Sequence, residues 1–278
     1  MSDLYAVLGH PIEHSRSPVI HQMFAQQTGQ DMQYVKHLVP LQQFDKFVDR
    51  LRQEGYKGVN VTVPFKTQAQ AYATHSTNRV LEAGAANTLK FESHEVWADN
   101  TDGWGLCRDI VNNAQVAIQG KSILLVGAGG AARGVLVPLL EHQPKHLVLA
   151  NRTHSKAMDM VQQMGLSNQV EVVDFEHWPN SRFDLIINAT SAGLEGQLLN
   201  PPRQLFDQAE LAYDMVYGAT DTPFMAWAKQ CGCLQTRDGL GMLVEQAAKA
   251  FEWWRGVMPQ TTPVLHALRA QMATKETR

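Results

Sequence analysis

A chain of 278 residues is longer than most single hydrophobic cores, so we expect two domains. With 44% hydrophobic and 18% charged residues, the composition is that of an ordinary globular protein and excludes long disordered regions. The formal charge of -3 and the lack of a Lys/Arg block argue against nucleic acid or an anionic membrane as the main partner.

Neither a membrane span nor a metal site is predicted. No apolar run approaches the ~20 residues that cross a bilayer, and MSDLYAVLGHPIEH lacks the regions of a signal peptide, so we expect a cytoplasmic protein. The spacing of His10 and His14 would suit one helix face, but Pro11 disfavours a helix there. The three cysteines contain no CxxC pair and are interpreted as packed thiols: Cys107, Cys231 and Cys233.

Strand-like runs alternate with helix-length segments, which is typical of βαβ units and a mainly parallel sheet. We expect strands at residues 5–9, 33–39, 58–63, 122–128, 145–151, 183–189 and 211–216. A helix is expected between Leu41 and Arg52, because apolar residues recur there at helical spacing: Leu41, Phe44, Phe47, Val48 and Leu51. The polar stretch 112–121 is the best candidate for a linker.

The last part of the chain predicts a helix from about Met242 that ends before Pro259, with Trp253 and Trp254 as packing residues. Terminal helices often return to the first domain. We therefore predict a discontinuous domain of residues 1–103 with 239–278, and a nucleotide-binding domain of residues 104–238 inserted into it.

The segment NVTVPFK (60–66) places a lysine just after a predicted strand. Val59, Val61 and Val63 alternate with polar residues, and Pro64 ends the ladder because it has no N–H to donate. Lys66 would then stand at a strand's carboxyl end, where open α/β sheets bind ligands. The alternative from this segment alone is a solvated lysine that opens the next helix.

The sequence SILLVGAGGAARGVLVPLL predicts a dinucleotide-binding turn. An apolar strand runs into Gly127-x-Gly129-x-x-Ala132, and an apolar helix follows. The first glycine permits the tight turn, the second allows a pyrophosphate to approach, and the small third residue allows close helix packing. The helix N-terminus offers unpaired N–H groups to the phosphates.

The next predicted strand indicates which dinucleotide binds. An NAD site usually has Asp or Glu at this position, whereas this chain has Asn151, Arg152 and Thr153, followed by Lys156. Two cations near a ribose favour a 2′-phosphate, so we predict NADP. Capping of the next helix by Thr153 or Ser155 is an alternative that could coexist with binding.

Eight segments occur in the order found in the shikimate dehydrogenase family, which the chain resembles over nearly its whole length: HSRSP, GVNVTVPFK, GAANTL, NTDGWG, VGAGGAAR, NRT, NATSAG and GLGMLVEQAA. The resemblance implies the reversible reduction of 3-dehydroshikimate to shikimate with NADPH, in aromatic amino acid biosynthesis. It also implies an α/β substrate-binding domain and a Rossmann-type NADP domain, with the active site in the cleft between them.

The resemblance also implies roles for individual residues. Lys66 and Asp102 match the family's catalytic lysine and aspartate, although Asp102 alone could be a helix N-cap. Substrate contacts carried over are Ser15, Ser17, Thr62, Asn87, Tyr217 and Gln246, and Ser17 before Pro18 could instead cap a helix. Cofactor contacts carried over are Gly127, Ala128, Gly129, Gly130, Ala131, Asn151, Arg152, Thr153, Lys156, Thr190, Met215, Gly239 and Met242, with Ser191 beside Thr190.

Two departures from the family pattern limit the prediction. Lys156 stands where many relatives have a second arginine, which would weaken the preference for NADP. GATDTP after Tyr217 lacks an expected proline, which leaves the shape of that loop open.

The alternatives are a quinate/shikimate dehydrogenase that also uses NAD and a non-catalytic NADP-binding regulator, which would be expected to lose Lys66 or Asp102. The resemblance suggests a monomer or a homodimer.

Overall fold

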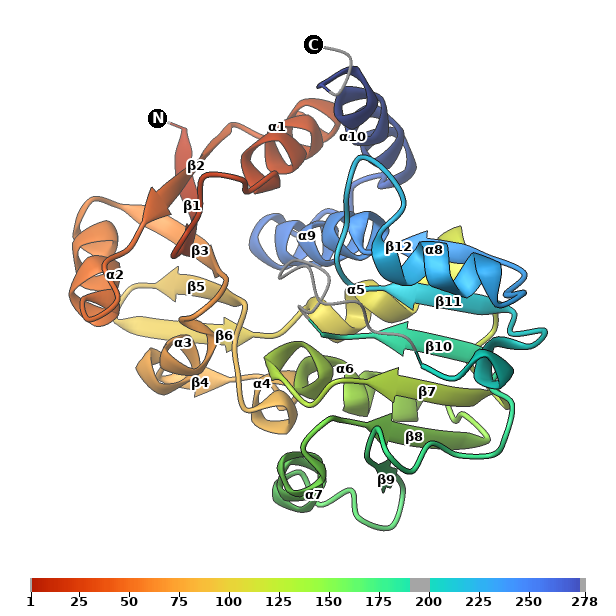
Figure 1. The fold of residues 1–278 in the computed structure, drawn as a ribbon. Helices are drawn as coiled ribbons and strands as arrows, with labels where there is room; N and C mark the ends of the chain where they lie inside the picture. Colours follow the sequence, from red (N-terminus) through yellow and green to blue (C-terminus); the bar gives the residue numbers. More distant parts are fainter. Residues whose placement is uncertain (1, 191–200, 276–278) are drawn as a thin grey trace. The chain divides into compact units, whose positions relative to one another are not determined.

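The computed structural model describes residues 2–190 and 201–275 (Figure 1). Packing of the Cα atoms divides the chain into two compact units. The first contains Met1–Gly105 with Val244–His266, and the second contains Leu106–Leu243 with Ala267–Arg278. No helix within the described ranges is long and apolar enough to span a bilayer.

The first unit is built on a mixed sheet of six strands (Figure 1). Their spatial order is β2 (Met32–Leu38), β1 (Asp3–Gly9), β3 (Tyr56–Val61), β5 (Thr88–Glu92), β6 (Glu95–Asp99) and β4 (His75–Ser76). Three pairings are parallel, and β5 runs antiparallel to both β3 and β6. The β5–β6 hairpin was not predicted, because its turn at Ser93 lacks the usual Asn or Gly although Ser93 adopts a φ of 48°.

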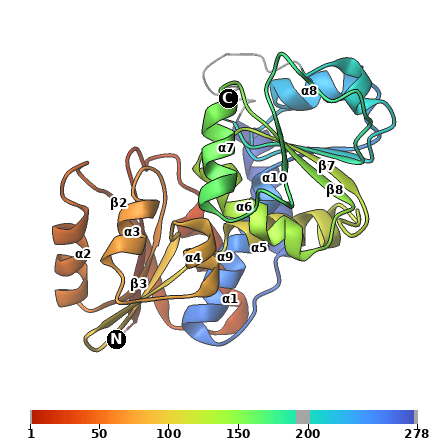
Figure 2. The same cartoon turned by 90° about the horizontal axis from the view of Figure 1, so that it is seen from below.

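Helices cover both faces of this sheet (Figure 2). On one face, alternate residues of β1 and β3 form a buried cluster with apolar side chains of three helices. These helices are α2 (Phe44–Gln53), α3 (Lys66–Tyr72) and α4 (Asn78–Ala83). On the other face, Tyr5 packs with Trp254 of α9 (Leu240–Arg255). His21 of α1 (Ser17–Thr28) also contacts Trp254, so the predicted packing role of this tryptophan is confirmed.

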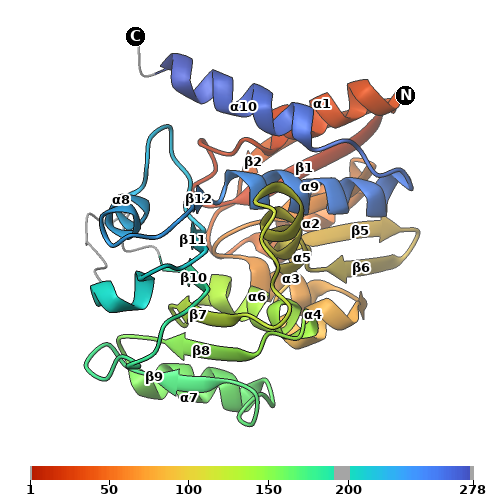
Figure 3. The ribbon, with the colours of Figure 1, turned by 90° about the vertical axis from the view of Figure 1, so that its right-hand side faces the viewer.

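The second unit contains a fully parallel sheet in the doubly wound order (Figure 3). From one edge to the other the strands are β12 (Thr236–Asp238), β11 (Leu211–Asp214), β10 (Leu185–Asn188), β7 (Ser122–Val126), β8 (His146–Ala150) and β9 (Glu171–Val173). The direction of winding reverses between β7 and β10. Loops at the carboxyl ends of these two strands therefore lie where such sheets bind nucleotides.

Both faces of the second sheet are buried by apolar contacts. Successive residues of β7 feed different clusters, with Ile123 and Leu125 in one and Leu124 and Val126 in the other, because strand side chains alternate. The covering elements are α6 (Gly130–Glu141), α7 (His154–Gln163), a 3-10 turn (Arg203–Phe206) and α8 (Pro223–Gln230). The remaining helices of the described ranges are α5 (Asp102–Arg108), which continues as a π-helical turn (Asp109–Asn113), and α10 (Thr262–Lys275).

The predicted α/β fold is confirmed, with several local differences. Val63 is 64% exposed and follows β3, and Leu41 is 54% exposed before α2, so neither belongs to the core. The stretch 112–121 is not a linker, because Val116 and Ile118 are buried in the second unit.

Residues 267–278 group with the second unit and not with the first. One reason is Arg269, whose guanidinium pairs with the Asp238 carboxylate and donates to the Gly218 carbonyl. The functional assignment of 1–103 with 239–278 and of 104–238 remains a prediction.

Candidate functional site

Lys66 follows a turn that a buried aromatic ring anchors. β3 ends at Val61, and the Thr62 carbonyl accepts from the Phe65 N–H at 3.0 Å. Phe65 is 1% exposed and stacks on Phe44, which fixes the turn to the core. Lys66 is the first residue of α3, as the alternative interpretation expects, but its side chain is paired with a carboxylate and is not simply solvated.

The Lys66 ammonium forms an ion pair with Asp102, with 2.5 Å between Nζ and Oδ2. The lysine side chain is 28% exposed and the aspartate 15%, so the pair is partly withdrawn from water but still accessible. Asp102 is the first residue of α5, and its own N–H donates to Asn100 Oδ1 at 3.1 Å. Its carboxylate thus faces Lys66 and not its own helix terminus.

Asn87 joins the ion pair to a further predicted substrate residue. Its amide nitrogen donates to Asp102 Oδ1 at 2.9 Å and to Gln246 Oε1 at 3.2 Å. Its amide oxygen accepts from the Thr101 N–H at 2.9 Å. Asn87 is 3% exposed, so its amide makes these bonds where water has little access. The structure therefore brings Lys66, Asp102, Asn87 and Gln246 together within the first unit.

The other predicted substrate residues of the first unit lie on loops. Ser15 Oγ accepts from the Ser17 N–H at 3.4 Å. The N-cap of α1 is Arg16, and Ser17 makes no capping bond, so its buried hydroxyl does not have the alternative role. Thr62 follows β3 and its N–H donates to the Leu8 carbonyl at 2.9 Å. Among the described residues, none of the three side chains bonds to Lys66 or Asp102, and their roles stay predictions.

The glycine-rich turn of the second unit has the geometry that its residue types predict. Gly127 has a φ of 110°, and a Cβ atom there would lie 2.8 Å from the Thr190 methyl group. Gly129 is the N-cap of α6, and a Cβ atom added at Gly129 or Gly130 would meet nothing within 4 Å. Ala132 is fully buried in the core. The N-terminus of α6 is thus open to a ligand, and the preceding turn admits only glycine without strain.

Asn151 connects this turn to the predicted 2′-phosphate site. Its Oδ1 accepts from the Ala128 N–H at 3.1 Å, and its Nδ2 donates to the Thr153 carbonyl at 2.8 Å. Thr153 is the N-cap of α7 but makes no side-chain capping bond. Arg152 and Lys156 are exposed, and neither pairs with a carboxylate in the described part of the chain. These two cations fit a phosphate group.

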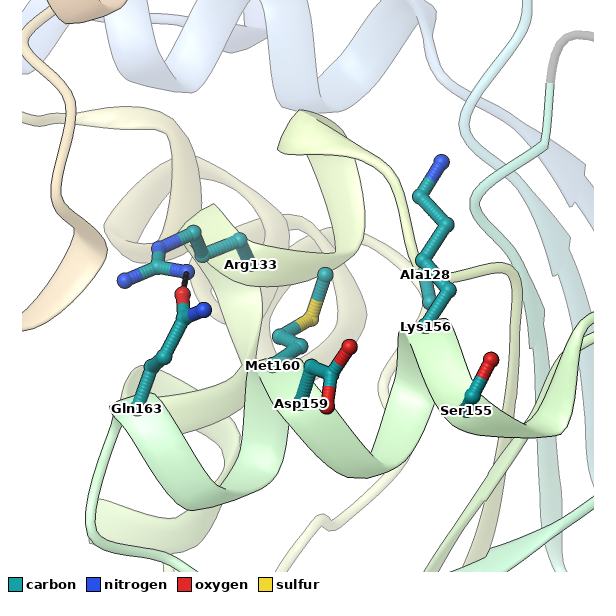
Figure 4. Close-up of a pocket in the computed structure, with 7 residues that line it drawn as sticks. All are labelled: Ala128, Arg133, Ser155, Lys156, Asp159, Met160 and Gln163. Atoms are coloured by element: carbon teal, nitrogen blue, oxygen red, sulfur yellow. Dashed lines mark hydrogen bonds between the residues drawn. The ribbon is translucent and has the colours of Figure 1, made fainter.

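A pocket of about 340 Å³ adjoins these residues. Its lining is Ala128, Arg133, Ser155, Lys156, Asp159, Met160 and Gln163. Lys156, Ser155 and Asp159 project from α7, while the Arg133 guanidinium, from α6, donates to Gln163 Oε1 at 3.2 Å (Figure 4). The lining mixes two cations with one carboxylate. A phosphate in this pocket would be attracted to Lys156 and repelled by Asp159.

The remaining predicted residues of the second unit follow β10, β11 and β12. Thr190 donates from its N–H and its hydroxyl to Asn188 Oδ1, at 3.1 and 2.7 Å. Met215 and Met242 are partly buried and pack on the apolar cluster of the second unit that contains Ile123 and Leu125. Tyr217 lies in the segment after β11. Ser191 lies outside the described residues.

Gly239 is a close-packing position, because an added Cβ would lie 2.2 Å from the Met215 carbonyl oxygen. Gly241 is similar, with Asp109 Oδ1 only 2.0 Å from such an atom. The buried Asp109 carboxylate accepts from the Tyr213 hydroxyl at 2.7 Å and pairs with Arg237 at 3.0 Å. This cluster fixes the start of α9, and Asp109 was not predicted because nothing in the sequence links it to Arg237.

A second buried carboxylate that the sequence did not reveal holds the segment before Asp102. Asp99 is fully buried and receives two bonds from the Arg79 guanidinium, at 3.0 and 2.6 Å. It also accepts from the Thr77 hydroxyl and from the Asn100 N–H, each at 2.8 Å. The bidentate pair is strong and directional, so it fixes where Asp102 begins α5.

Family models match most of the chain. Residues 7–89 match the "Shikimate dehydrogenase substrate binding domain", residues 109–195 match "Shikimate / quinate 5-dehydrogenase", and residues 239–269 match the "Shikimate 5'-dehydrogenase C-terminal domain".

Known proteins similar over the full length agree with these matches. The NADP(+) shikimate dehydrogenase of Herminiimonas arsenicoxydans is 54% identical over 98% of this chain and 99% of its own. An Ael1 enzyme from Pseudomonas putida is 43% identical, with a TM-score of 0.92 over 96% of this chain and 98% of its own. Shikimate 5-dehydrogenase from Thermus thermophilus, solved in complex with NADP(H) and shikimate, is 30% identical, with a TM-score of 0.86 over 96% and 99%.

Proposed function

This chain belongs to the shikimate dehydrogenase family, and on that premise we propose that it catalyses the reversible NADPH-dependent reduction of 3-dehydroshikimate to shikimate. It is an oxidoreductase of the shikimate pathway, and its cofactor is NADP. The observation that carries the mechanism is the accessible Lys66–Asp102 ion pair, held in place by Asn87.

The geometry of the pair suits carbonyl reduction. The turn before α6 and the loop after β8 would hold the dinucleotide, which would supply a hydride to the substrate's carbonyl carbon, so that negative charge would develop on the carbonyl oxygen. The Lys66 ammonium provides a proton or a charged hydrogen bond to that oxygen, and Asp102 holds the ammonium at 2.5 Å. Both aspartate oxygens already accept bonds, one from Lys66 and one from Asn87, so its orientation needs no rearrangement when substrate enters.

We assign the substrate to Ser15, Ser17, Thr62, Asn87, Gln246 and Tyr217. Neutral hydroxyl and amide groups suit a polyhydroxylated carboxylic acid, because they donate and accept without adding charge. Within the first unit, Asn87 and Gln246 are bonded to each other next to the ion pair, which supports their part of this assignment.

We assign the cofactor to three groups of residues in the second unit. The turn with the N-terminus of α6 would hold the pyrophosphate, and its residues are Gly127, Ala128, Gly129, Gly130 and Ala131. The loop after β8, with Asn151, Arg152, Thr153 and Lys156, would hold the 2′-phosphate. Thr190, Met215, Gly239 and Met242 would lie at the nicotinamide end. Open space at α6 supports the first assignment, and two exposed cations that pair with no carboxylate among the described residues, Arg152 and Lys156, support the second.

Two alternatives have different consequences. A quinate/shikimate dehydrogenase that also uses NAD would keep the same ion pair but discriminate less between cofactors. A non-catalytic regulator would bind NADP without turnover, and the intact Lys66–Asp102 pair argues against it. We further expect a cytoplasmic enzyme that is a monomer or a homodimer.

The test is steady-state oxidation of shikimate by the purified protein, followed by the absorbance of the reduced cofactor, with NADP⁺ and NAD⁺ in parallel. Lys66→Ala should lower turnover by at least ~100-fold, as expected for loss of an acid–base group, and leave NADP⁺ binding nearly unchanged. The exposed Lys57 on β3 provides the control variant Lys57→Ala, which should retain wild-type turnover. Full activity of Lys66→Ala would remove this residue from the mechanism.

A further inference from the structure

A buried chain of hydrogen bonds lies behind the Lys66–Asp102 pair. It begins at the half-buried Tyr34 of β2, whose hydroxyl donates to Asn60 Oδ1 at 2.7 Å. Asn60 Nδ2 donates to Thr88 Oγ1 at 3.0 Å, and Thr88 Oγ1 donates to Asn87 Oδ1 at 2.9 Å. Asn87 Nδ2 then donates to Asp102 at 2.9 Å. This hydrogen-bond chain thus runs from β2 through β3 and β5, and it ends on the Asp102 carboxylate that holds Lys66.

Every bond in this chain points the same way. The Thr88 hydroxyl has a single proton. Its oxygen lies between the amide N–H₂ of Asn60 on one side and the amide oxygen of Asn87 on the other. The proton must therefore go to Asn87. Burial raises the pKa of the Tyr34 phenol well above its ordinary value, and a hydrogen bond with the Ser17 side chain opposes this only in part, so the phenol keeps the proton that it donates to Asn60. Hydrogen bonds aligned in one direction polarise and strengthen one another.

The orientation of the Asn87 amide matters because its two ends have opposite chemistry. In the observed orientation the N–H₂ group faces the Asp102 carboxylate, and the oxygen receives bonds from Thr88 and from the Thr101 N–H. A flipped amide would set its oxygen against the carboxylate, which repels it, and would leave the two donors unsatisfied. Thr88 is fully buried, so no water can replace its proton.

We propose that Thr88 is a positioning residue of the active site, with Asn60 and Tyr34 as supporting links. Thr88 fixes the Asn87 amide, and the amide in turn orients Asp102 for reaction. The inference rests on the proposed function, because Asn87 and Asp102 act on shikimate only if the chain is a shikimate dehydrogenase. It adds a residue on β5 whose hydroxyl is one bond removed from Asn87 and two from the carboxylate.

The test compares Thr88→Val, which has nearly the same shape but no hydroxyl, with Thr88→Ser, which keeps it. Thr88→Val should lower kcat/KM for shikimate about tenfold, the upper end for one hydrogen bond, since the Thr101 N–H still holds Asn87. KM for NADP⁺ should change less than twofold, because the cofactor residues lie in the other unit. Thr88→Ser should return kcat/KM to within about twofold of wild type.

Thr74→Val is the matched control. Among the described residues its hydroxyl bonds to the Val96 backbone alone, at 3.0 and 2.8 Å, and Val96 lies on β6 of the same sheet. It should alter stability but not kcat/KM. A Thr88→Val protein that melts earlier yet keeps wild-type kcat/KM would reduce Thr88 to a structural role and overturn the inference.

The supporting links are tested at Tyr34, the half-exposed start of the hydrogen-bond chain. Tyr34→Phe removes a single hydroxyl, and this variant is expected to fold even if Thr88→Val does not. Tyr34→Phe should lower kcat/KM about threefold and have little further effect in the Thr88→Val background, because linked residues are not additive. If the effects of the two substitutions on kcat/KM simply multiply, Tyr34 is not part of this hydrogen-bond chain. An inactive wild-type protein would instead refute the proposed function.

Discussion

His21 of α1 is a fully buried imidazole, and neither ring nitrogen has a hydrogen-bond partner among the residues that the structure describes. The ring stacks on Tyr34, with 4.2 Å between the centroids, and contacts Phe24, Phe251 and Trp254. Burial lowers the pKa of His21 to about 3 from its ordinary 6.5, and the nearby Asn60 opposes this only in part. The folded protein therefore keeps this ring neutral in mild acid.

The consequence is a loss of stability as the pH falls. The unfolded chain protonates His21 near its ordinary pKa of 6.5, whereas the folded chain does so only near 3. The stabilising contribution is thus complete above the unfolded pKa, is lost progressively between these two values, and stays constant below the lower one. Between pH 7 and pH 4.5 the free energy of unfolding should fall by about 2.5 kcal/mol from this residue alone.

We predict that His21→Phe removes this part of the pH dependence, because phenylalanine does not titrate and fills the same aromatic site. Denaturant unfolding at the two pH values gives the free energy of unfolding for both proteins. The drop between them should be smaller in the variant by about 2.5 kcal/mol. Carboxylates elsewhere contribute to both proteins and cancel. His21→Leu should show the same reduced drop despite poorer packing, and equal drops in variant and wild type would refute the reasoning.

Two further predictions concern the second unit. Arg152→Ala should raise KM for NADP⁺ by at least about tenfold but change KM for NAD⁺ little, because a charged hydrogen bond to phosphate contributes roughly 1.5–3 kcal/mol. Equal effects on both cofactors, measured by initial rates, would reject the 2′-phosphate assignment. Gly239→Ala should lower the free energy of unfolding by about 3 kcal/mol, since its methyl group would overlap the Met215 carbonyl. An unchanged melting temperature in a scanning experiment would show that this contact relaxes freely.

The sequence alone determined the alternating α/β pattern, the glycine turn and the order of the family motifs. These features are local: Gly127 needs its neighbours β7 and α6, and Pro64 ends its own strand. Chain order also decided the parallel sheet of the second unit, because its strands are joined by helices or long loops. The predicted end of one strand was wrong, because the alternating valines extended it to Val63, which lies beyond β3 and is 64% exposed.

The tertiary structure alone decided which polar side chains meet. Lys66 lies 36 positions from Asp102, and Asn87 lies 159 from Gln246, yet each pair is hydrogen-bonded. A hydroxyl such as that of Thr88 looks like any strand threonine until β3 and β5 pair antiparallel and set it between two amides. Such contacts depend on strand register and on burial, which removes competing water. Residue types and spacing record neither, so the supporting network became visible only in the folded chain.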